Sequence, residues 1–157
     1  MSERTEKAVF TVMVMVEDRE GRVLIQNKKS KSWGGLVFPG GHVESGEFFT
    51  DAAVREVREE SGLTVLDPTL VGVKQFLMPD YRYVVHLYRA TRFTGKLTSS
   101  DEGEVFFIPK DELLKRKGEM PVSFDRMLDM FFGNIRASEH CMYPDPENEG
   151  EWIQVFK

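Results

Sequence analysis

One stretch of the chain, Glu47 to Glu60, combines a helix-forming composition with the absence of glycine and proline. Gly62 follows it at the position of a C-terminal helix cap. Segments rich in valine, phenylalanine and tyrosine lie before and after this stretch, and such residues favour strands. A helix set between strands restricts the chain to an architecture that mixes helices with a sheet, so we expect an α/β (α+β) fold.

The strands expected before this helix form a hairpin. Ala8 to Val16 and Arg22 to Gln26 read as its two strands, joined by a turn at residues 18–21. Residues 27–35 are expected to form an exposed loop, and residues 36–38 lead into Pro39-Gly40-Gly41.

The part of the chain after Gly62 alternates further strands with two helices. The strands are predicted over Leu66 to Leu77, Tyr81 to Phe93, Glu104 to Ile108 and Trp152 to Phe156. The helices are predicted over Asp111 to Lys117 and Phe124 to Phe132, and Tyr143 to Gly150 is predicted as a loop. Methionine and phenylalanine at helical spacing in the second helix favour core packing over a ligand pocket.

A length of 157 residues is typical of one domain, which we expect to span residues 1–157. Hydrophobic residues make up 41% and charged residues 30%, as in soluble globular proteins. The net charge of -5 argues against a nucleic-acid polymer as a partner, since such proteins usually carry a basic face. It does not argue against a nucleotide, because bound cations can reverse the charge of an acidic site.

The single cysteine, Cys141, allows no intramolecular disulfide, and a reducing compartment is the default expectation. A buried or inert thiol is expected in preference to a catalytic one paired with His140. The apolar run Ala8 to Val16 is too short to cross a membrane and lacks a signal-peptide cleavage pattern, so no membrane partner is expected. These features predict a cytoplasmic protein.

Three glutamates gather on one face of the predicted helix. Glu56, Glu59 and Glu60 stand at i, i+3 and i+4, and their mutual repulsion is tolerated if cations lie among them. Hard oxygen ligands suit Mg²⁺, with Mn²⁺ as an alternative. Spacing alone leaves a second interpretation open, in which Arg55 and Arg58 pair with the glutamates on a solvated face.

The same helix face carries Ala52 and Ala53, whose small side chains allow the turn Pro39-Gly40-Gly41 to approach closely. Glu47 is open to two interpretations. It is either a fourth carboxylate of the site or a first-turn acid that opposes the helix dipole.

Residues 41–63, GHVESGEFFTDAAVREVREESGL, fill every specified position of the Nudix box. With average residue frequencies, a chance match at a given start is on the order of one in ten billion. The chain therefore resembles the Nudix hydrolase family, and residues 33–41 and 101–104 also resemble MutT-like bacterial members, notably Gram-positive proteins described as 8-oxo-dGTP diphosphatases. The matching residues of the box are Gly41, Glu47, Arg55, Glu56, Val57, Glu59, Glu60, Gly62 and Leu63.

The resemblance implies a mixed β-sheet sandwiched between α-helices, and it implies roles for the box residues. Glu56, Glu59 and Glu60 would be the main metal ligands, with Gly41 and Glu47 as further members of the metal site. Glu59 or Glu60 would also activate water, and Arg55 would orient the glutamates.

A loop carboxylate outside the box often contributes a ligand or the general base in this family. Glu104 is the first choice for that role and Glu102 the second, and the alternative for both is a solvated acidic loop. Gly40 is expected at the substrate. Phe38 and Trp33 are candidates to bind the base, although Phe38 also suits the core.

The activity that the resemblance implies is metal-dependent hydrolysis of a nucleoside triphosphate, including 8-oxo-dGTP, to a nucleoside monophosphate and pyrophosphate. Pro79 and Tyr81 stand where some relatives carry markers for ADP-ribose or dinucleoside polyphosphates, so these substrates stay open. A non-catalytic nucleotide-binding module is a third alternative. The oligomeric state is also open, with a homodimer as one option.

Overall fold

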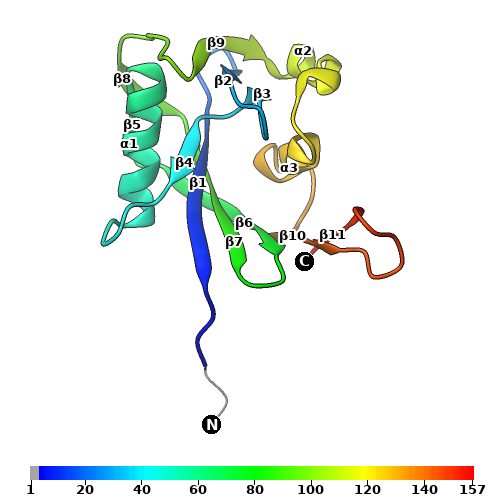
Figure 1. Ribbon diagram of the computed structural model, residues 1–157. Coiled ribbons are helices and arrows are strands. Elements are labelled where there is room, and N and C mark those ends of the chain that lie inside the picture. The colour runs from blue at the N-terminus through cyan, green and yellow to red at the C-terminus, as the bar shows by residue number, and fades with distance from the viewer. Residues whose placement is uncertain (1–3) are drawn as a thin grey trace.

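The computed structural model describes residues 4–157 and is built around a six-stranded mixed sheet (Figure 1). Its strands stand in the order β11-β10-β6-β7-β1-β4. Their bounds are β1 (Ala8–Val16), β4 (Gly40–His42), β6 (Thr69–Leu77), β7 (Arg82–Ala90), β10 (Glu139–Pro144) and β11 (Trp152–Phe156). β1 runs parallel to β7 and β10 runs parallel to β6, whereas the other neighbours are antiparallel.

Two smaller sheets and the helices complete the described part of the chain. One small sheet has the order β3-β2-β9, with β3 (Gly35–Val37), β2 (Arg22–Lys28) and β9 (Gly103–Pro109). The other pairs β5 (Leu63–Leu66) with β8 (Arg92–Gly95). The helical segments are α1 (Phe49–Ser61), α2 (Lys110–Lys115), the 3-10 turn η1 (Lys117–Glu119) and α3 (Phe124–Phe131).

β1 separates two hydrophobic cores, because successive residues of a strand point to opposite faces of the sheet. Val12 and Val14 pack in one core with Ala52, Ala53 and Val57 of α1. Met13 and Met15, on the other face, pack in a second core with residues of α3, including Leu128 and Phe131. Helices therefore cover both faces of the sheet, and the predicted sandwich is confirmed (Figure 1).

The predicted elements differ from the structure mainly where pairing partners are distant in sequence. β1 and β11 have the predicted bounds, and β2 continues to Lys28 into the predicted loop because it pairs with β9 there. The predicted strand over residues 81–93 is two strands, since the chain leaves β7 after Ala90 and β8 pairs with β5. β5 and β10 were not predicted.

The helix of the glutamates starts at Phe49 instead of Glu47. Gly46 has a left-handed φ of 79°, and the Glu47 carboxylate accepts a hydrogen bond from the backbone N–H of Glu44. Glu47 therefore closes a turn ahead of α1, and the first-turn acid of the helix is Asp51.

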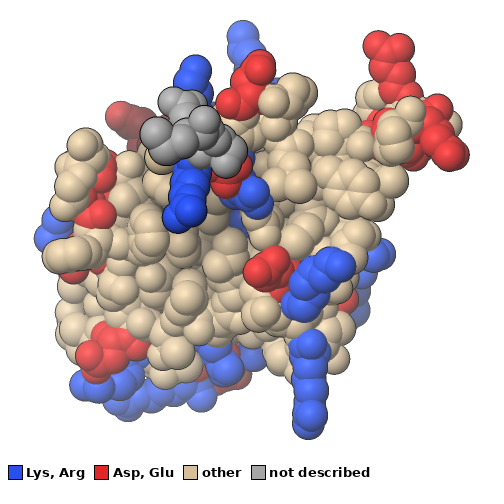
Figure 2. Space-filling view, turned by 90° about the horizontal axis from the view of Figure 1, so that it is seen from below, with Lys and Arg blue, Asp and Glu red and all other residues tan. Residues whose placement is uncertain are grey.

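Within residues 4–157, every helix is too short or too polar to cross a membrane. The β10–β11 hairpin protrudes from the body, and acidic side chains gather at its tip (Figure 2). The loop that joins these two strands contains Asp145, Glu147, Glu149 and Glu151. Much of the remaining surface in this view is uncharged.

Candidate active site

α1 holds its glutamates in place because neighbouring residues of the helix are anchored in the core. Ala52, Ala53 and Val57 are fully buried against β1, and Gly62 ends the helix with a left-handed φ of 73° and an N–H that donates to the carbonyl of Arg58. β4 lies between α1 and β1 (Figure 1), so the glutamates face a glycine strand.

The glycines of β4 approach α1 closely, as the turn at residues 39–41 was predicted to do. A Cβ atom on Gly41 would lie 2.5 Å from Cδ and Oε1 of Glu56. The backbone N–H of Gly40 donates a hydrogen bond of 2.9 Å to Oε2 of Glu60. Only a residue without a side chain leaves this space for the Glu56 carboxylate.

Glu60 is a buried carboxylate with two donors, the Gly40 N–H and the amine of Lys28. Its side chain is 3% exposed, and its Oε1 lies 3.3 Å from Lys28 Nζ. Burial raises the pKa of Glu60 to about 7, against the opposing attraction of Lys28. Lys28 also lies 3.2 Å from Oε2 of Glu102, so one amine links the two carboxylates.

Arg55 holds the remaining glutamates together. Its guanidinium lies 2.8 Å from Oε1 of Glu47, 2.9 Å from Oε1 of Glu56 and 3.3 Å from Oε2 of Glu59. Arg55 also donates a hydrogen bond of 2.9 Å to the carbonyl oxygen of His42. The hydrogen bond from Arg55 lowers the pKa of Glu47 to about 2, whereas burial raises the pKa of Glu56.

A cavity of about 630 Å³ lies beside this cluster and has the size of a small-molecule site. Lys28, Gly40 and Gly41 line it, and each of them contacts or directly faces a glutamate of α1. Trp33 and Phe38 line it as well, although Phe38 is also fully buried in the core. The structure thus brings the three predicted substrate residues, Trp33, Phe38 and Gly40, to one cavity.

A model of the NUDIX domain family matches residues 7–128, well over half of the chain. The chain belongs to the NUDIX domain family. The matched region contains α1, β4 and the segment with Glu102, so every glutamate of the acidic cluster beside the cavity lies inside it.

Two curated NUDIX relatives show how far the similarity extends. An uncharacterized Nudix hydrolase of Bacillus subtilis, YvcI, is 35% identical over 92 residues, covering 55% of this chain and 57% of its own length. The oxidized purine nucleoside triphosphate hydrolase of Danio rerio is 38% identical over 104 residues, covering 62% of this chain and 63% of its own length. The chain therefore spans less than two thirds of the length of both relatives.

A solved structure extends the likeness in fold to nearly the whole chain. The MutT protein from Bacillus halodurans has a TM-score of 0.67 and 23% identity, covering 93% of this chain and 97% of that one. At this identity the likeness shows the fold, a NUDIX fold with its mixed sheet between helices.

NUDIX hydrolases generally use divalent metal ions, and the residues of this site fit such an ion in their chemistry. Glu56 and Glu60 are oxygen donors of the kind that Mg²⁺ prefers, and Gly41 leaves room beside Glu56. Burial raises the pKa of both carboxyl groups, so a nearby cation would stabilise their charged forms. Within residues 4–157 no three acidic, histidine or cysteine side chains already converge as a metal site, because Arg55 and Lys28 occupy the carboxylates.

The two candidate carboxylates of the 101–104 loop lie in different surroundings in this NUDIX protein. Glu102 shares Lys28 with Glu60, and a hydrogen bond with Glu60 contributes to a lowered pKa of Glu102. Glu104 is exposed on β9. Its neighbour Val105 packs in the core beside α1, so strand alternation points the Glu104 side chain to the other face of the sheet, away from α1. The geometry therefore favours the second choice, Glu102, over Glu104.

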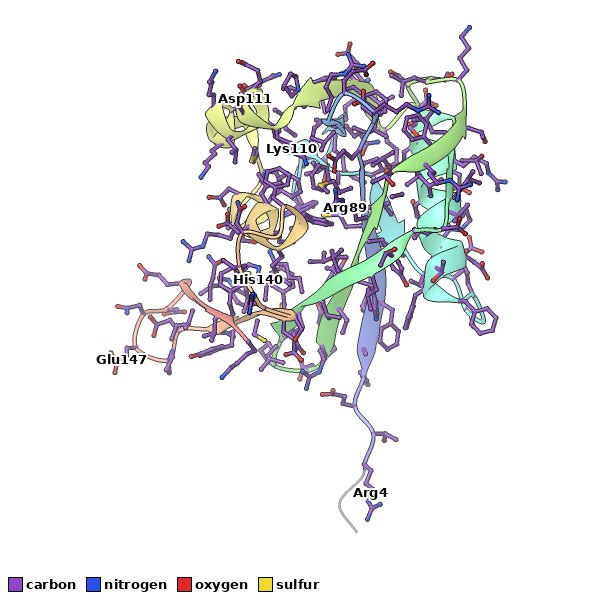
Figure 3. All side chains as sticks on the ribbon, turned by 180° about the vertical axis from the view of Figure 1, so that it is seen from behind. Arg4, Arg89, Lys110, Asp111, His140 and Glu147 are labelled. Carbon is purple, nitrogen blue, oxygen red and sulfur yellow. The ribbon has the colours of Figure 1, made fainter. Side chains whose placement is uncertain are left out.

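The cysteine of this NUDIX protein lacks the surroundings of a nucleophile. Burial raises the pKa of Cys141, and its thiol lies 3.4 Å from the Glu139 carboxylate. His140 lies at the base of the hairpin (Figure 3). It precedes Cys141 directly in β10, so its ring and the Cys141 thiol point to opposite faces of the strand. Its ring contacts Gln154 at 2.9 Å, so the two side chains form no catalytic pair.

Several cavity residues were not predicted from the sequence. Lys28 was assigned to a loop, and Lys74, Ser123 and Trp152 were given no role. A lysine inside the otherwise apolar strand around residues 71–77 was the one local signal for Lys74. The other positions become recognisable only when the chain folds.

Proposed function

We propose that this NUDIX protein hydrolyses a diphosphate linkage of a purine nucleoside triphosphate, using a divalent cation and releasing a nucleoside monophosphate and pyrophosphate. One observation carries the proposal. Lys28 and Gly40 each line the cavity and each contact Glu60, so acidic groups suited to a metal adjoin a cavity suited to a nucleoside. The Danio rerio relative, an oxidized purine nucleoside triphosphate hydrolase, supports purine triphosphates as the substrate class, oxidised ones included.

The residues of the site have separate roles in the proposed reaction: metal binding, positioning of the metal ligands and proton transfer. Glu56, Glu59 and Glu60 would hold Mg²⁺ or Mn²⁺, which neutralises phosphate charge and lowers the pKa of water when bound. Arg55 keeps Glu56 and Glu59 in place through its two ion pairs. Glu59 or Glu60 would accept the proton of the attacking water.

Lys28 would bind the phosphates of the substrate. Its amine lies between Glu60 and Glu102 and also faces the cavity. An ammonium group that reaches both the acidic cluster and the cavity is well placed to contact phosphate oxygens.

ADP-ribose and dinucleoside polyphosphates are the alternative substrates, and residues at their marker positions lie in or near the cavity. Tyr81, at the position of a marker for dinucleoside polyphosphates, lines the cavity. Pro79 lies with Tyr81 around a smaller hollow at the β6–β7 turn. These compounds therefore belong in the substrate panel.

The test compares the wild-type protein with Glu60→Gln in the presence of Mg²⁺ or Mn²⁺. We expect kcat/KM on nucleoside triphosphates to fall by ~10²-fold or more in the variant, because removing a carboxylate that binds metal or accepts a proton has effects of this size. Glu147→Gln is the control, since Glu147 lies at the tip of the hairpin, far from α1 (Figure 3), and should retain full activity.

Two further measurements separate the remaining outcomes. Mn²⁺ binding followed by electron paramagnetic resonance should weaken in Glu56→Gln and Glu60→Gln but not in Glu147→Gln. Unchanged hydrolysis by Glu60→Gln would refute the metal-site assignment. Nucleotide binding without hydrolysis of any panel compound by the wild-type protein would instead identify a non-catalytic module.

A further inference from the structure

Lys74 is a buried lysine at the wall of the cavity. It lies on β6, it is only 1% exposed, and it is one of the residues that line the cavity. Its amine donates a hydrogen bond to Oγ of Ser123 and lies 4.8 Å from the centre of the Phe76 ring. Among the described residues Ser123 is the one hydrogen-bond acceptor of this amine, so its ammonium form keeps N–H groups for a ligand.

This position is energetically unfavourable for a lysine. Within residues 4–157 no carboxylate lies within 4 Å of its amine, and Asp125 supplies only a longer-range attraction. Burial lowers the pKa of Lys74 to about 7. A methionine, whose side chain is nearly as long, would fill most of the same space beside Phe76 without that cost, so the fold itself does not require the amine.

The partner of Lys74 is also strained. Ser123 has a left-handed φ of 67°, a conformation that is unfavourable for a residue with a side chain. Both unfavourable features meet at the same part of the cavity wall. Strained and unpaired groups concentrate at sites that contact ligands, and here they define a buried polar spot in a largely apolar cavity.

The surroundings of this spot suit a purine. Phe76 contacts Tyr83 and Trp152 edge to face, with ring centroids 6.0 Å apart in each pair, and all three residues line the cavity. Aromatic walls bind flat bases by stacking without regard to their substituents. Discrimination between bases therefore depends on the few polar groups, of which Lys74 is the most buried.

We infer that Lys74 is a specificity-determining residue whose amine donates a hydrogen bond to a carbonyl oxygen of the base, so that the site favours oxo-purines over amino-purines. The inference rests on the proposed function and deepens it. A carbonyl oxygen accepts from Lys74 and stabilises its ammonium form, which has donors only. The 6-amino group of adenine is itself a donor and gives that form no acceptor.

The test measures kcat/KM for two substrate pairs that differ at one carbonyl, dITP with dATP and 8-oxo-dGTP with dGTP, in the wild-type protein and in Lys74→Met. We expect the wild type to prefer the oxo member of at least one pair. In Lys74→Met, kcat/KM for that oxo substrate should fall by ~10- to 100-fold, while the value for its partner changes by less than about threefold.

Two further variants serve as a control and as an intermediate case for Lys74→Met. Lys110→Met removes another lysine that lies over an aromatic ring, 5.3 Å from the centre of Phe132, but near α2 and outside the cavity lining (Figure 3). It should leave both preferences unchanged. Lys74→Gln, whose amide both donates and accepts, should narrow the preference without abolishing it, and it serves in place of Lys74→Met if that variant does not fold.

Equal losses on all four substrates, or no change in either preference, would overturn the inference. If the wild-type protein hydrolyses no triphosphate, the proposed function fails, but calorimetric binding of dIMP and dAMP still tests Lys74. Tighter binding of dIMP to the wild type that disappears in Lys74→Met supports the role, and equal binding of the two nucleotides to the wild type refutes it.

Discussion

At the scale of single residues, Glu60 and Lys74 are buried ionisable groups of opposite charge, and burial shifts the pKa of each towards neutrality. Burial raises the pKa of Glu60 and lowers that of Lys74, in each case to about 7. The ionised form of each is therefore disfavoured until a ligand compensates it, by a cation near Glu60 and by a hydrogen-bond acceptor near Lys74. Both groups adjoin one cavity, directly or through Lys28 and Gly40.

The lowered pKa of Lys74 predicts how stability depends on pH. The unfolded chain binds a proton at this lysine up to pH about 10.5, whereas the folded protein releases it above about 7. The unfolded state thus binds more protons between these values, so the contribution of Lys74 to stability rises with pH by up to ~1.4 kcal/mol per unit. As the pH is lowered towards 7, the contribution of Lys74 to the free energy of unfolding decreases, and below pH 7 it stays constant.

Lys74→Met should therefore be more stable than the wild type at pH 7, by a few kcal/mol according to that slope, and the difference should shrink by pH 9.5. Urea unfolding at both pH values measures it, with Lys110→Met as the control for lysine removal in general. The other charged groups around Lys74 and its neighbour His140 are Asp125 and Arg126, and burial lowers the pKa of His140 to about 4, well below this window. A loss of stability in Lys74→Met at pH 7 would contradict the predicted cost of the buried amine.

At the scale of elements, α1 was the most predictable part of the fold. Its composition, its glutamate spacing and the cap at Gly62 are local features, and local features determine a helix. Its start was misplaced by two residues because the contact of Glu47 with Arg55 and the Glu44 N–H depends on the folded turn. β5 and β10 were missed because each becomes a strand by pairing with a distant partner, β8 and β6 respectively.

Gly62 gives a prediction for this element. Alanine there would have to adopt the left-handed φ of 73° and would place its Cβ 2.5 Å from the carbonyl oxygen of Lys96. We expect Gly62→Ala to lower the free energy of unfolding by ~1–3 kcal/mol. Gly118→Ala is the matched control, because a Cβ at Gly118 meets no atom within 4 Å and the backbone is not left-handed. Equal midpoints of the two variants in chemical denaturation would refute the strain at the cap.

At the scale of the whole molecule, the motif predicted the acidic site but could not predict the cavity. The Nudix box lies within 23 consecutive residues, and the structure joins three of its glutamates, Glu47, Glu56 and Glu59, into one network through Arg55. The cavity is assembled from residues of β1 to β4, β6 and β7, of the loop after β2, of α3 with the two residues before it, and of the C-terminal hairpin. No local pattern records that Lys74, Ser123 and Trp152 become neighbours, so the choice of nucleotide depends on residues whose proximity arises only in the folded chain.

The C-terminal hairpin lies outside the matched family region and still reaches the cavity through Trp152. The indole packs edge to face on Phe76, which in turn lies against Lys74, so the hairpin forms part of the wall for the base. Among the described residues Trp152 packs on Phe76 and makes no hydrogen bond to a glutamate of α1, so its loss should weaken binding without changing the chemical step.

We therefore expect Trp152→Ala to raise KM for purine triphosphates by ~10-fold, the value of one lost aromatic contact with a base, with kcat within about threefold of the wild type. Trp152→Phe keeps a flat apolar ring and should retain most of the affinity. Steady-state kinetics on both variants separates the two parameters. A fall in kcat at unchanged KM would place the hairpin in the catalytic step, whereas a selective rise in KM assigns it to nucleotide binding and makes a segment beyond the NUDIX match part of the substrate site.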